Sequence, residues 1–129
     1  MAFDEGQQDL FTATYEQYCR AFLPPHPLAF GILIYRDNDP VGFVAYQEKF
    51  ATYLGRKVFY VEDVYLGKYQ YSAEVFYWLL KEIELYAVKG GYCRIEIRRL
   101  EYHAPPDDPL LSFHYLPIKK WKIWRKKLA

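Results

Sequence analysis

Residues 60–80, YVEDVYLGKYQYSAEVFYWLL, decide the fold, because an apolar segment of strand character runs directly into an apolar segment of helix character. The polar elbow between these two segments contains a single glycine, Gly67. The start of a helix that follows a strand is a common phosphate site, since free N–H groups and the positive end of the helix dipole point there. The elbow is therefore the first candidate for a binding site in this chain.

Composition predicts a folded protein with one domain over residues 1–129. Of these residues 52% are hydrophobic and 20% aromatic, which excludes a disordered chain. The net charge of +1 gives no general attraction to nucleic acid or to a membrane. No stretch has the pattern of a signal peptide or the length of a membrane span, so we expect a cytoplasmic protein. Cys19 and Cys93 lack the spacing of a zinc or redox site and are expected to be buried free thiols.

Hydrophobic periodicity and turn residues predict the order of elements on both sides of the elbow. The expected elements are a helix at 6–23, strands at 28–35, 41–47 and 58–66, a helix at 72–89, a strand at 92–100, a short helix at 109–116 and a last strand at 119–128. The first three strands, joined by connections at 36–40 and 48–57, form an antiparallel meander, and the helix at 72–89 crosses over to a parallel strand. The fold class is α+β, with a mixed, mostly antiparallel sheet flanked by helices.

The segment VGFVAYQEKFATYLGRKVFYVEDVYL, residues 41–66, resembles the spermidine/spermine and thialysine branch of the GNAT superfamily of N-acetyltransferases. There, a VGFA strand, an excursion with Tyr and Gly-Lys, and a strand ending YLEDLYV follow in the same order. The likeness extends from about residue 29 to the end of the chain. It implies a GNAT-like fold that splays two strands apart to hold the pantetheine arm of acetyl-CoA. The opening MAFDEG is too short for the family's first strand and helix, so we expect a fold truncated at its N-terminus.

In this family the pyrophosphate of the cofactor sits on an elbow of the form R/Q-x-x-G-x-G/A. Aligned without a gap, the cofactor positions fall on the strand end and the elbow: Val64, Leu66, Tyr71, Ser72, Glu74 and Phe76. The arginine or glutamine of the family falls on Tyr71. Its glycines, which let a pyrophosphate approach the backbone, fall on Ser72, Glu74 and Phe76. Glu74 also places a carboxylate beside that pyrophosphate, whereas Ser72 reads as an ordinary helix N-cap.

The altered elbow predicts a GNAT-fold protein that has lost ordinary acetyl-CoA binding and acts through a protein or a small ligand, with no cofactor. The alternative is an active enzyme that uses acetyl-CoA to acetylate a polyamine-like or lysine-like amine. The resemblance implies direct transfer, in which an amine attacks the thioester, a carboxylate or water takes its proton, and a tyrosine protonates the thiolate.

Two residues match the catalytic positions of the family. Glu62, in the pair Glu62-Asp63, is a candidate general base, and since strand neighbours point to opposite faces, only one of the pair is expected to reach the cleft. The family's Phe-Tyr pair falls on Phe113-His114, or with a slip of one residue on His114-Tyr115, which makes Tyr115 a candidate acid. Each residue also has a purely structural interpretation. Glu62 can be a paired or solvent-facing carboxylate, and Tyr115 can be a half-buried tyrosine of the core.

The C-terminal KKWKIWRKK interleaves aromatic residues with cations, as single-strand nucleic-acid binders do, but a strand with a solvated basic face is the favoured interpretation. The elbow is surrounded by four aromatic residues, Tyr69, Tyr71, Tyr77 and Trp78. Such aromatics are typical of protein interfaces and also of cores. We expect a homodimer or a protein partner, not nucleic acid or a membrane. His26 and His103 have no carboxylates at ligand spacing, so no metal site is predicted.

Overall fold

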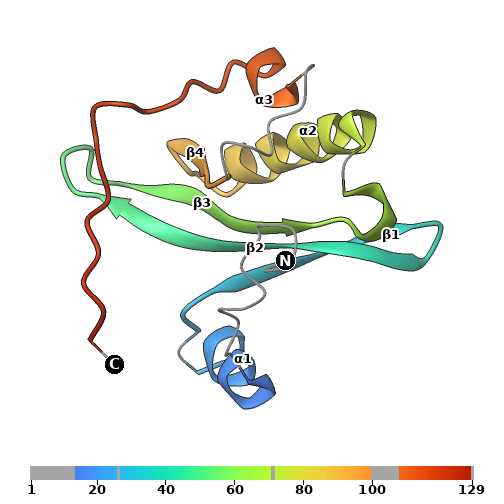
Figure 1. Ribbon diagram of the computed structural model, residues 1–129, viewed down its shortest axis with the longest axis horizontal. Helices are drawn as coiled ribbons and strands as arrows, with labels where there is room; N and C mark the ends of the chain where they lie inside the picture. The colour runs from blue at the N-terminus through green and yellow to red at the C-terminus, as the bar shows by residue number, and fades with distance from the viewer. Residues whose placement is uncertain (1–13, 26, 71, 100–107, 129) are drawn as a thin grey trace.

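The computed structural model describes residues 14–25, 27–70, 72–99 and 108–128. A four-stranded sheet of order β1-β2-β3-β4 forms its centre, with β1–β2 and β2–β3 antiparallel and β3–β4 parallel (Figure 1). The elements are α1 (Tyr15–Phe22), β1 (Phe30–Arg36), β2 (Asp39–Ala51), β3 (Arg56–Tyr65), the short 3-10 helix η2 (Gly67–Tyr69), α2 (Ala73–Lys89), β4 (Arg94–Ile97) and α3 (Pro109–Ser112). The expected α+β class and the parallel crossover are confirmed.

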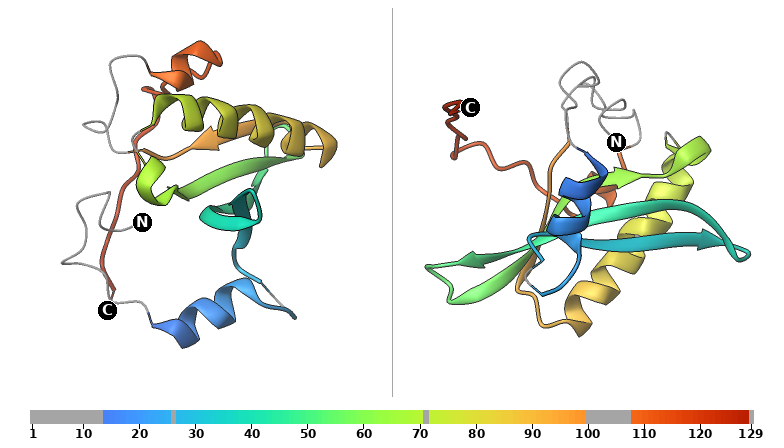
Figure 2. Two further views of the ribbon diagram at one scale, coloured as in Figure 1. Left: turned by 90° about the vertical axis from the view of Figure 1, so that its right-hand side faces the viewer. Right: turned by 90° about the horizontal axis from the view of Figure 1, so that it is seen from below.

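Helix α2 covers one face of the sheet, and α1 lies on the opposite face (Figures 1 and 2). The buried side of α2 consists of Leu79, Leu80, Ile83 and Ala87. Leu79, Ile83 and Ala87 belong to one core cluster with Phe59 and Val61 of β3. Apolar burial at these alternating strand positions holds the helix on the sheet and fixes where its N-terminus meets the end of β3.

The helix ends follow local capping chemistry. The Ser72 Oγ accepts a hydrogen bond from the Val75 N–H at 3.2 Å, so α2 begins at Ala73, as expected. Helix α1 starts at Tyr15 because Thr14 and Gln17 form a reciprocal capping box. The rest of the predicted first helix, residues 6–13, lies outside the described residues, as does the expected truncation of the fold at its N-terminus.

The second strand is longer than its sequence pattern predicts. Residues 48–57 were expected to connect two strands, but β2 continues to Ala51 and pairs with β3 down to Arg56. The turn needs only the four residues between these two, and its last residue, Gly55, has the positive φ of 64° that glycine adopts without strain. The turn between β1 and β2 is formed by Asp37 and Asn38, both at positive φ, which matches the tight hairpins that such residues favour.

The prediction of a last strand at residues 119–128 is wrong for the single chain. Residues 119–128 form no strand in the structure, and their side chains are exposed. The alternation of apolar and basic residues suits a strand, but a strand also needs a neighbour to pair its backbone groups. Among the residues that the structure describes, this segment has no such neighbour.

Candidate functional site

The pairing of β3 with β4 ends at the position where the sequence places the candidate site. Their parallel pairing runs from Val58↔Arg94 to Val61↔Ile97, and a last hydrogen bond joins the Arg98 N–H to the Val61 carbonyl at 3.1 Å. Beyond this point β3 continues to Tyr65 without a β4 partner among the described residues. The ladder stops where β4 itself ends, after only four residues, and the expected divergence of the two strands stays a prediction.

A β-bulge at Glu62 marks the end of this pairing. Ala45 and Tyr46 of β2 oppose Asp63 and Val61, so Glu62 is an extra residue in β3. The bulge shifts the alternation of side chains, and both Glu62 and Asp63 contact the Arg98 guanidinium, at 3.2 and 3.8 Å. The expectation that the two carboxylates point to opposite faces is therefore wrong, because the regular alternation stops at the bulge.

The end of β3 is closed by the side chain of Gln70. Its Oε1 accepts a hydrogen bond from the Leu66 N–H at 2.7 Å, and its Nε2 donates to the Val64 carbonyl at 3.2 Å. Before the bulge, the carbonyls of Lys57 and Val61 face β4, since they accept from Cys93 and Arg98. The extra residue shifts this phase by one, so Val64 and Leu66 present backbone groups toward the space beside β3. Gln70 occupies both of those groups.

Sequence reasoning missed Gln70, although a signal was present. The residue precedes by one position the site at which the gap-free register places the family's arginine or glutamine, and it has the right side-chain type. Tyr71, which that register selects, lies outside the described residues. The role of Gln70 depends on the course of η2, which bends the chain back so that position 70 reaches the strand it has just left.

The remaining elbow residues form an ordinary helix start. Ser72 caps α2, and Glu74 is exposed in its first turn, where a carboxylate suits the helix dipole. Phe76 is half-buried and packs against the core cluster. Its ring therefore does not cover the start of the helix, whereas the Ser72 hydroxyl and the Glu74 carboxylate both remain there.

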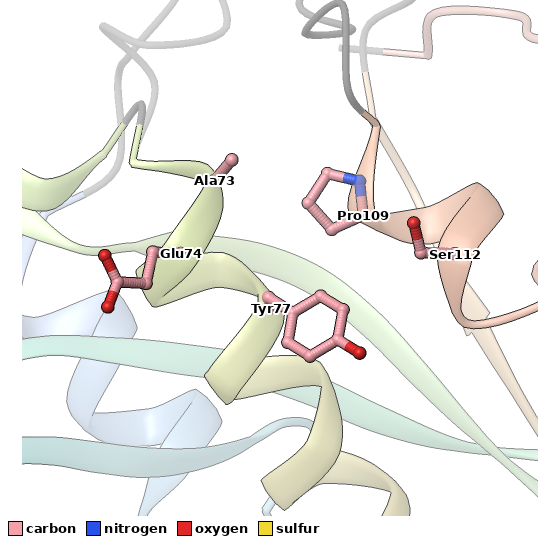
Figure 3. A pocket seen from close by; sticks show the side chains of 5 residues that line it. All are labelled: Ala73, Glu74, Tyr77, Pro109 and Ser112. Atoms are coloured by element: carbon pink, nitrogen blue, oxygen red, sulfur yellow. The ribbon is translucent and has the colours of Figure 1, made fainter.

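A hollow of about 280 Å³ lies between the start of α2 and α3 (Figure 3). Its lining residues are Ala73, Glu74, Tyr77, Pro109 and Ser112. Figure 3 shows the Tyr77 ring turned toward Ser112 and the Glu74 carboxylate turned away from α3. The Tyr77 ring also meets Phe113 edge to face, with ring centroids 4.6 Å apart, so α3 is fixed against α2.

Tyr115 lies beyond α3, where its N–H donates to the Leu110 carbonyl at 2.9 Å. Its hydroxyl is buried and has no hydrogen-bond partner in the described part of the chain. Burial, with a smaller contribution from the Glu84 carboxylate on α2, raises the pKa of the Tyr115 phenol to about 12. Across residues 14–128, apart from the undescribed gaps, no hydrogen bond or ion pair connects Tyr115 with Glu62. The two catalytic candidates are thus not joined by a direct contact.

A second hollow, of about 520 Å³, lies beside the other margin of the β3 end. It is lined by Leu33, Pro40, Val41, Gly42, Phe43, Tyr65, Leu66, Gly67, Lys68 and Tyr69. A Cβ atom at Gly42 would lie 2.0 Å from the Tyr65 carbonyl oxygen, so only glycine allows β2 to approach β3 this closely. This contact holds the β3 end in place from the side opposite Gln70.

The described ranges give no support for a metal site or for a membrane-spanning helix. No group of three or more His, Cys, Asp or Glu side chains is placed to hold a metal ion in the part of the chain that the structure describes. Of the helices within those same ranges, none combines the length and apolar character that a membrane span requires.

No protein-family model matches the chain, and no curated protein matches its sequence. Solved structures do match its fold. An integron cassette protein from the mobile metagenome of V. cholerae aligns with a TM-score of 0.70 at 13% identity, over 98% of this chain and 78% of the other.

Two named acetyltransferases align similarly. An aminoglycoside acetyltransferase from an uncultured soil metagenomic sample has a TM-score of 0.64 at 11% identity, over 99% of this chain and 82% of its own. The ribosomal-protein-alanine N-acetyltransferase from Brucella melitensis biovar Abortus 2308 has a TM-score of 0.60 at 15% identity, over 79% and 71%. With the order of its elements and its mixed, mostly antiparallel sheet, this chain has the α+β fold of the GNAT acetyltransferases.

Proposed function

We propose that this GNAT-fold chain does not bind acetyl-CoA in the ordinary way and acts instead by interaction with a protein or a small ligand. The observation that carries the proposal is a pair of hydrogen bonds: the Gln70 amide accepts from the Leu66 N–H and donates to the Val64 carbonyl. The resemblance to the GNAT family implies that these two backbone positions, beside the separated strands, serve the pantetheine arm. Here a side chain of the protein itself occupies them.

The residues at the strand end do not fit the cofactor as they stand. An amide that offers one donor and one acceptor to a strand makes the same two bonds that a pantetheine amide could make. Binding would exchange these hydrogen bonds for others of the same kind, each with a net value of about 0.5–1.5 kcal/mol, so the exchange gains little. The half-buried Gln70 side chain would also need a new place.

Electrostatics at the start of α2 also disfavours the binding of the cofactor's pyrophosphate. Ser72 already accepts from the Val75 N–H, which leaves one donor fewer for a phosphate. Glu74 holds a negative charge in the first turn. A like charge at about 4 Å adds repulsion of about 1 kcal/mol in water, and several times more where water is excluded. The protein supplies its own anion to the helix dipole.

Of the two proposed kinds of partner, a protein is better supported than a small ligand. The two hollows beside the elbow are open to solvent and lined mostly by apolar surface, whereas small-molecule sites enclose most of their ligand. Large apolar side chains are instead exposed over the surface, among them Tyr77 and Trp78 next to the elbow. Exposed aromatic side chains of this kind are enriched in protein interfaces.

An active acetyl-CoA-dependent N-acetyltransferase for a polyamine-like or lysine-like amine is the second candidate. Two observations favour it: β3 continues beyond the end of its pairing with β4, and Glu62 lies at the bulge where that pairing ends. In that case the Gln70 amide would move aside for the cofactor. Several structurally similar proteins are described as acetyltransferases, which agrees with this candidate as well as with a chain that has lost the activity.

Thermal unfolding with and without acetyl-CoA separates the two candidates. A ligand at 100 times its dissociation constant stabilises the folded state by about 2.7 kcal/mol, which is a clear shift in the unfolding midpoint. The proposal predicts no shift at millimolar acetyl-CoA. A shift that saturates with a micromolar midpoint, together with acetylation of spermidine or free lysine, would favour the active enzyme.

A further inference from the structure

The hairpin of β2 and β3 extends beyond the other described strands. On one side, the pairing of β1 with β2 stops at Tyr46. On the other side, β4 begins opposite Val58 of β3, and the N–H of the residue before β4 reaches the Lys57 carbonyl at 2.9 Å. Residues 47–57, which we call the hairpin extension, therefore project from the end of the sheet (Figures 1 and 2).

The hairpin extension ends in apolar side chains that the described residues leave uncovered. The exposed fraction is 65% for Phe50, 74% for Tyr53 and 46% for Leu54. A hairpin of two strands is only marginally stable by itself, so the fold gains little from lengthening it past its core. Neighbouring exposed apolar residues of this kind mark an interaction surface.

Basic side chains surround this apolar end. The hairpin extension contains three basic residues and one acidic residue: Lys49, Arg56, Lys57 and Glu48. The Glu48 carboxylate accepts a hydrogen bond from the Tyr92 hydroxyl at 2.6 Å, and the Lys49 ammonium lies 4.0 Å from the Glu96 carboxylate. Arg56 and Lys57 have no carboxylate within ion-pair distance among the described residues. Positive charge thus remains available to a partner.

The hairpin extension also has a free strand edge. Residues 47–51 pair with β3 on one side, and on the other side they lie beyond the start of β1. Their outward N–H and C=O groups therefore have no strand partner in the described part of the chain. An extended segment of another protein can add to such an edge through backbone hydrogen bonds.

The register of the hairpin fixes which side chains an added strand would meet. Lys49 and Ala51 share one face, and Arg56 lies on the same face because it pairs with Ala51. Phe50 lies on the opposite face. An added strand would therefore place alternate residues beside cations and the others beside an aromatic ring. Carboxylates on the first set and apolar side chains on the second set match both faces.

Charge selects among the possible occupants. The C-terminal segment of this chain or of a second copy has six cations between Lys119 and Lys127 and no Asp or Glu, so the hairpin extension repels it. Anionic membranes attract clusters of about four to eight cations, whereas only Arg56 and Lys57 are outside ion pairs in the hairpin extension. An acidic protein segment needs fewer cations, because backbone pairing adds to the attraction.

We propose that the hairpin extension binds an extended segment of a partner protein in which apolar residues alternate with Asp or Glu. The segment pairs with residues 47–51 of β2. This inference rests on the proposed function, in which the partner is a protein, and it places that partner at the end of β3 remote from the elbow. The experiments below contain no acetyl-CoA. Binding of acetyl-CoA would thus count against the proposed function alone, and failure of these experiments against the inference alone.

Selection from a phage-displayed library of random 12-residue peptides tests the partner chemistry. Against the full chain, we expect enriched peptides in which Asp or Glu alternates with apolar residues. Arg56→Glu with Lys57→Glu should weaken the binding of such a peptide at least tenfold, as measured by fluorescence anisotropy. Lys119→Glu with Lys120→Glu makes the same charge change outside the hairpin extension and should leave binding unchanged.

Three outcomes would overturn the proposal. The first is a selection without acidic, alternating peptides. The second is an equal loss of affinity in the two charge variants. The third is binding of the chain to phosphatidylserine vesicles that the Arg56→Glu, Lys57→Glu variant loses, since this would assign the hairpin extension to a membrane.

N-methylated versions of an enriched peptide test the strand pairing. In an added strand, every second N–H points to the edge, so N-methyl groups at one alternating set of positions should abolish binding. The same groups at the other set should be tolerated. Equal effects of the two sets would contradict pairing with the β2 edge.

Phe50→Thr separates an interaction residue from a structural one. Threonine retains strand propensity, so the unfolding midpoint should stay that of the wild type, while affinity for the enriched peptide falls at least fivefold. Leu33→Thr removes an apolar side chain of similar exposure, 63%, from β1 and should leave affinity unchanged. Unchanged affinity in Phe50→Thr, or an equal loss in Leu33→Thr, would count against the proposed surface.

Discussion

The Gln70 Oε1 accepts a hydrogen bond from the Leu66 N–H at 2.7 Å, so the loop before α2 closes the end of the strand that precedes it. In the resemblance to the GNAT family, this strand end and this loop belong to one cofactor site. Here they bind each other. We attribute the proposed loss of ordinary cofactor binding to this contact more than to the missing glycines.

Replacement of Gln70 by alanine should destabilise the fold. The variant leaves the Leu66 N–H and the Val64 carbonyl without their partner, and an unsatisfied buried group costs about 1–3 kcal/mol. Urea unfolding should show a loss in this range, reduced where water reaches the half-buried strand end. Gln47→Ala removes the same amide from β2, away from the strand end, and should cost less. Equal losses for the two variants would mean that the Gln70 contacts contribute nothing specific.

Removal of the Ser72 hydroxyl should weaken the start of α2. A lost N-cap typically costs about 0.5–2 kcal/mol, because the Val75 N–H loses its acceptor. Ser112→Ala provides the matched control, since Ser112 is exposed at the last position of α3. Chemical unfolding of Ser72→Ala that coincides with that of Ser112→Ala would contradict the assigned cap.

The Arg99–Asp108 pair should make stability depend on pH in the acid range. The Arg99 guanidinium, together with the Leu110 N–H, holds the pKa of the Asp108 carboxyl below its ordinary value. A carboxyl with a lowered folded pKa contributes stability above its unfolded pKa of about 3.9, and this contribution is lost as the pH falls through the folded value. Asp108→Asn should therefore be less stable than the parent at neutral pH.

The same difference should shrink toward zero as the pH falls below about 4, where the parent also becomes neutral at this position. Thermal unfolding of both proteins across this range measures it. A constant difference between the two proteins down to acid pH would show that the Asp108 charge is not what stabilises the contact.

Tyr115→Phe should leave stability unchanged or raise it by up to about 1 kcal/mol at neutral pH, because the buried hydroxyl has no partner in the described residues. A raised folded pKa means that the parent loses stability as the pH rises from the unfolded value of about 10 toward the folded one. The advantage of the phenylalanine variant should therefore grow above about pH 10. A clear loss of stability at neutral pH would indicate a partner for this hydroxyl.

The fold could be predicted from local pattern wherever one face of an element is buried. The alternation around Ile95 and Ile97 and the stripe from Val75 to Ile83 predicted β4 and α2, and their order along the chain predicted the parallel pairing. The length of β2 was missed, because Glu48 and Lys49 read as connection although strand pairing decides their state. The tail was missed for the opposite reason: its pattern suits a strand, but pattern says nothing about the partner.

The candidate site could be predicted only in part. Ser72 and Glu74 were identified as a helix start because capping is local chemistry. The bulge at Glu62 has no signal in its own residues, since it arises from the register between β2 and β3. The contact of Gln70 with Val64 requires the bend at η2, whose first residue, Gly67, has φ of 57°. The sequence shows Gly67 and Gln70, but it does not show the direction in which the chain bends between them.

Calorimetric titration of acetyl-CoA into the wild type, Gln70→Ala and Gln47→Ala tests the central claim most directly. If the Gln70 amide occupies the strand end, the wild type and Gln47→Ala should show no binding at tens of micromolar protein. Gln70→Ala, confirmed to be folded, should gain at least tenfold in affinity, which corresponds to about 1.4 kcal/mol. Low-micromolar binding by the wild type, unchanged in Gln70→Ala, would contradict the account and would make Glu62 and Tyr115 the residues to mutate next.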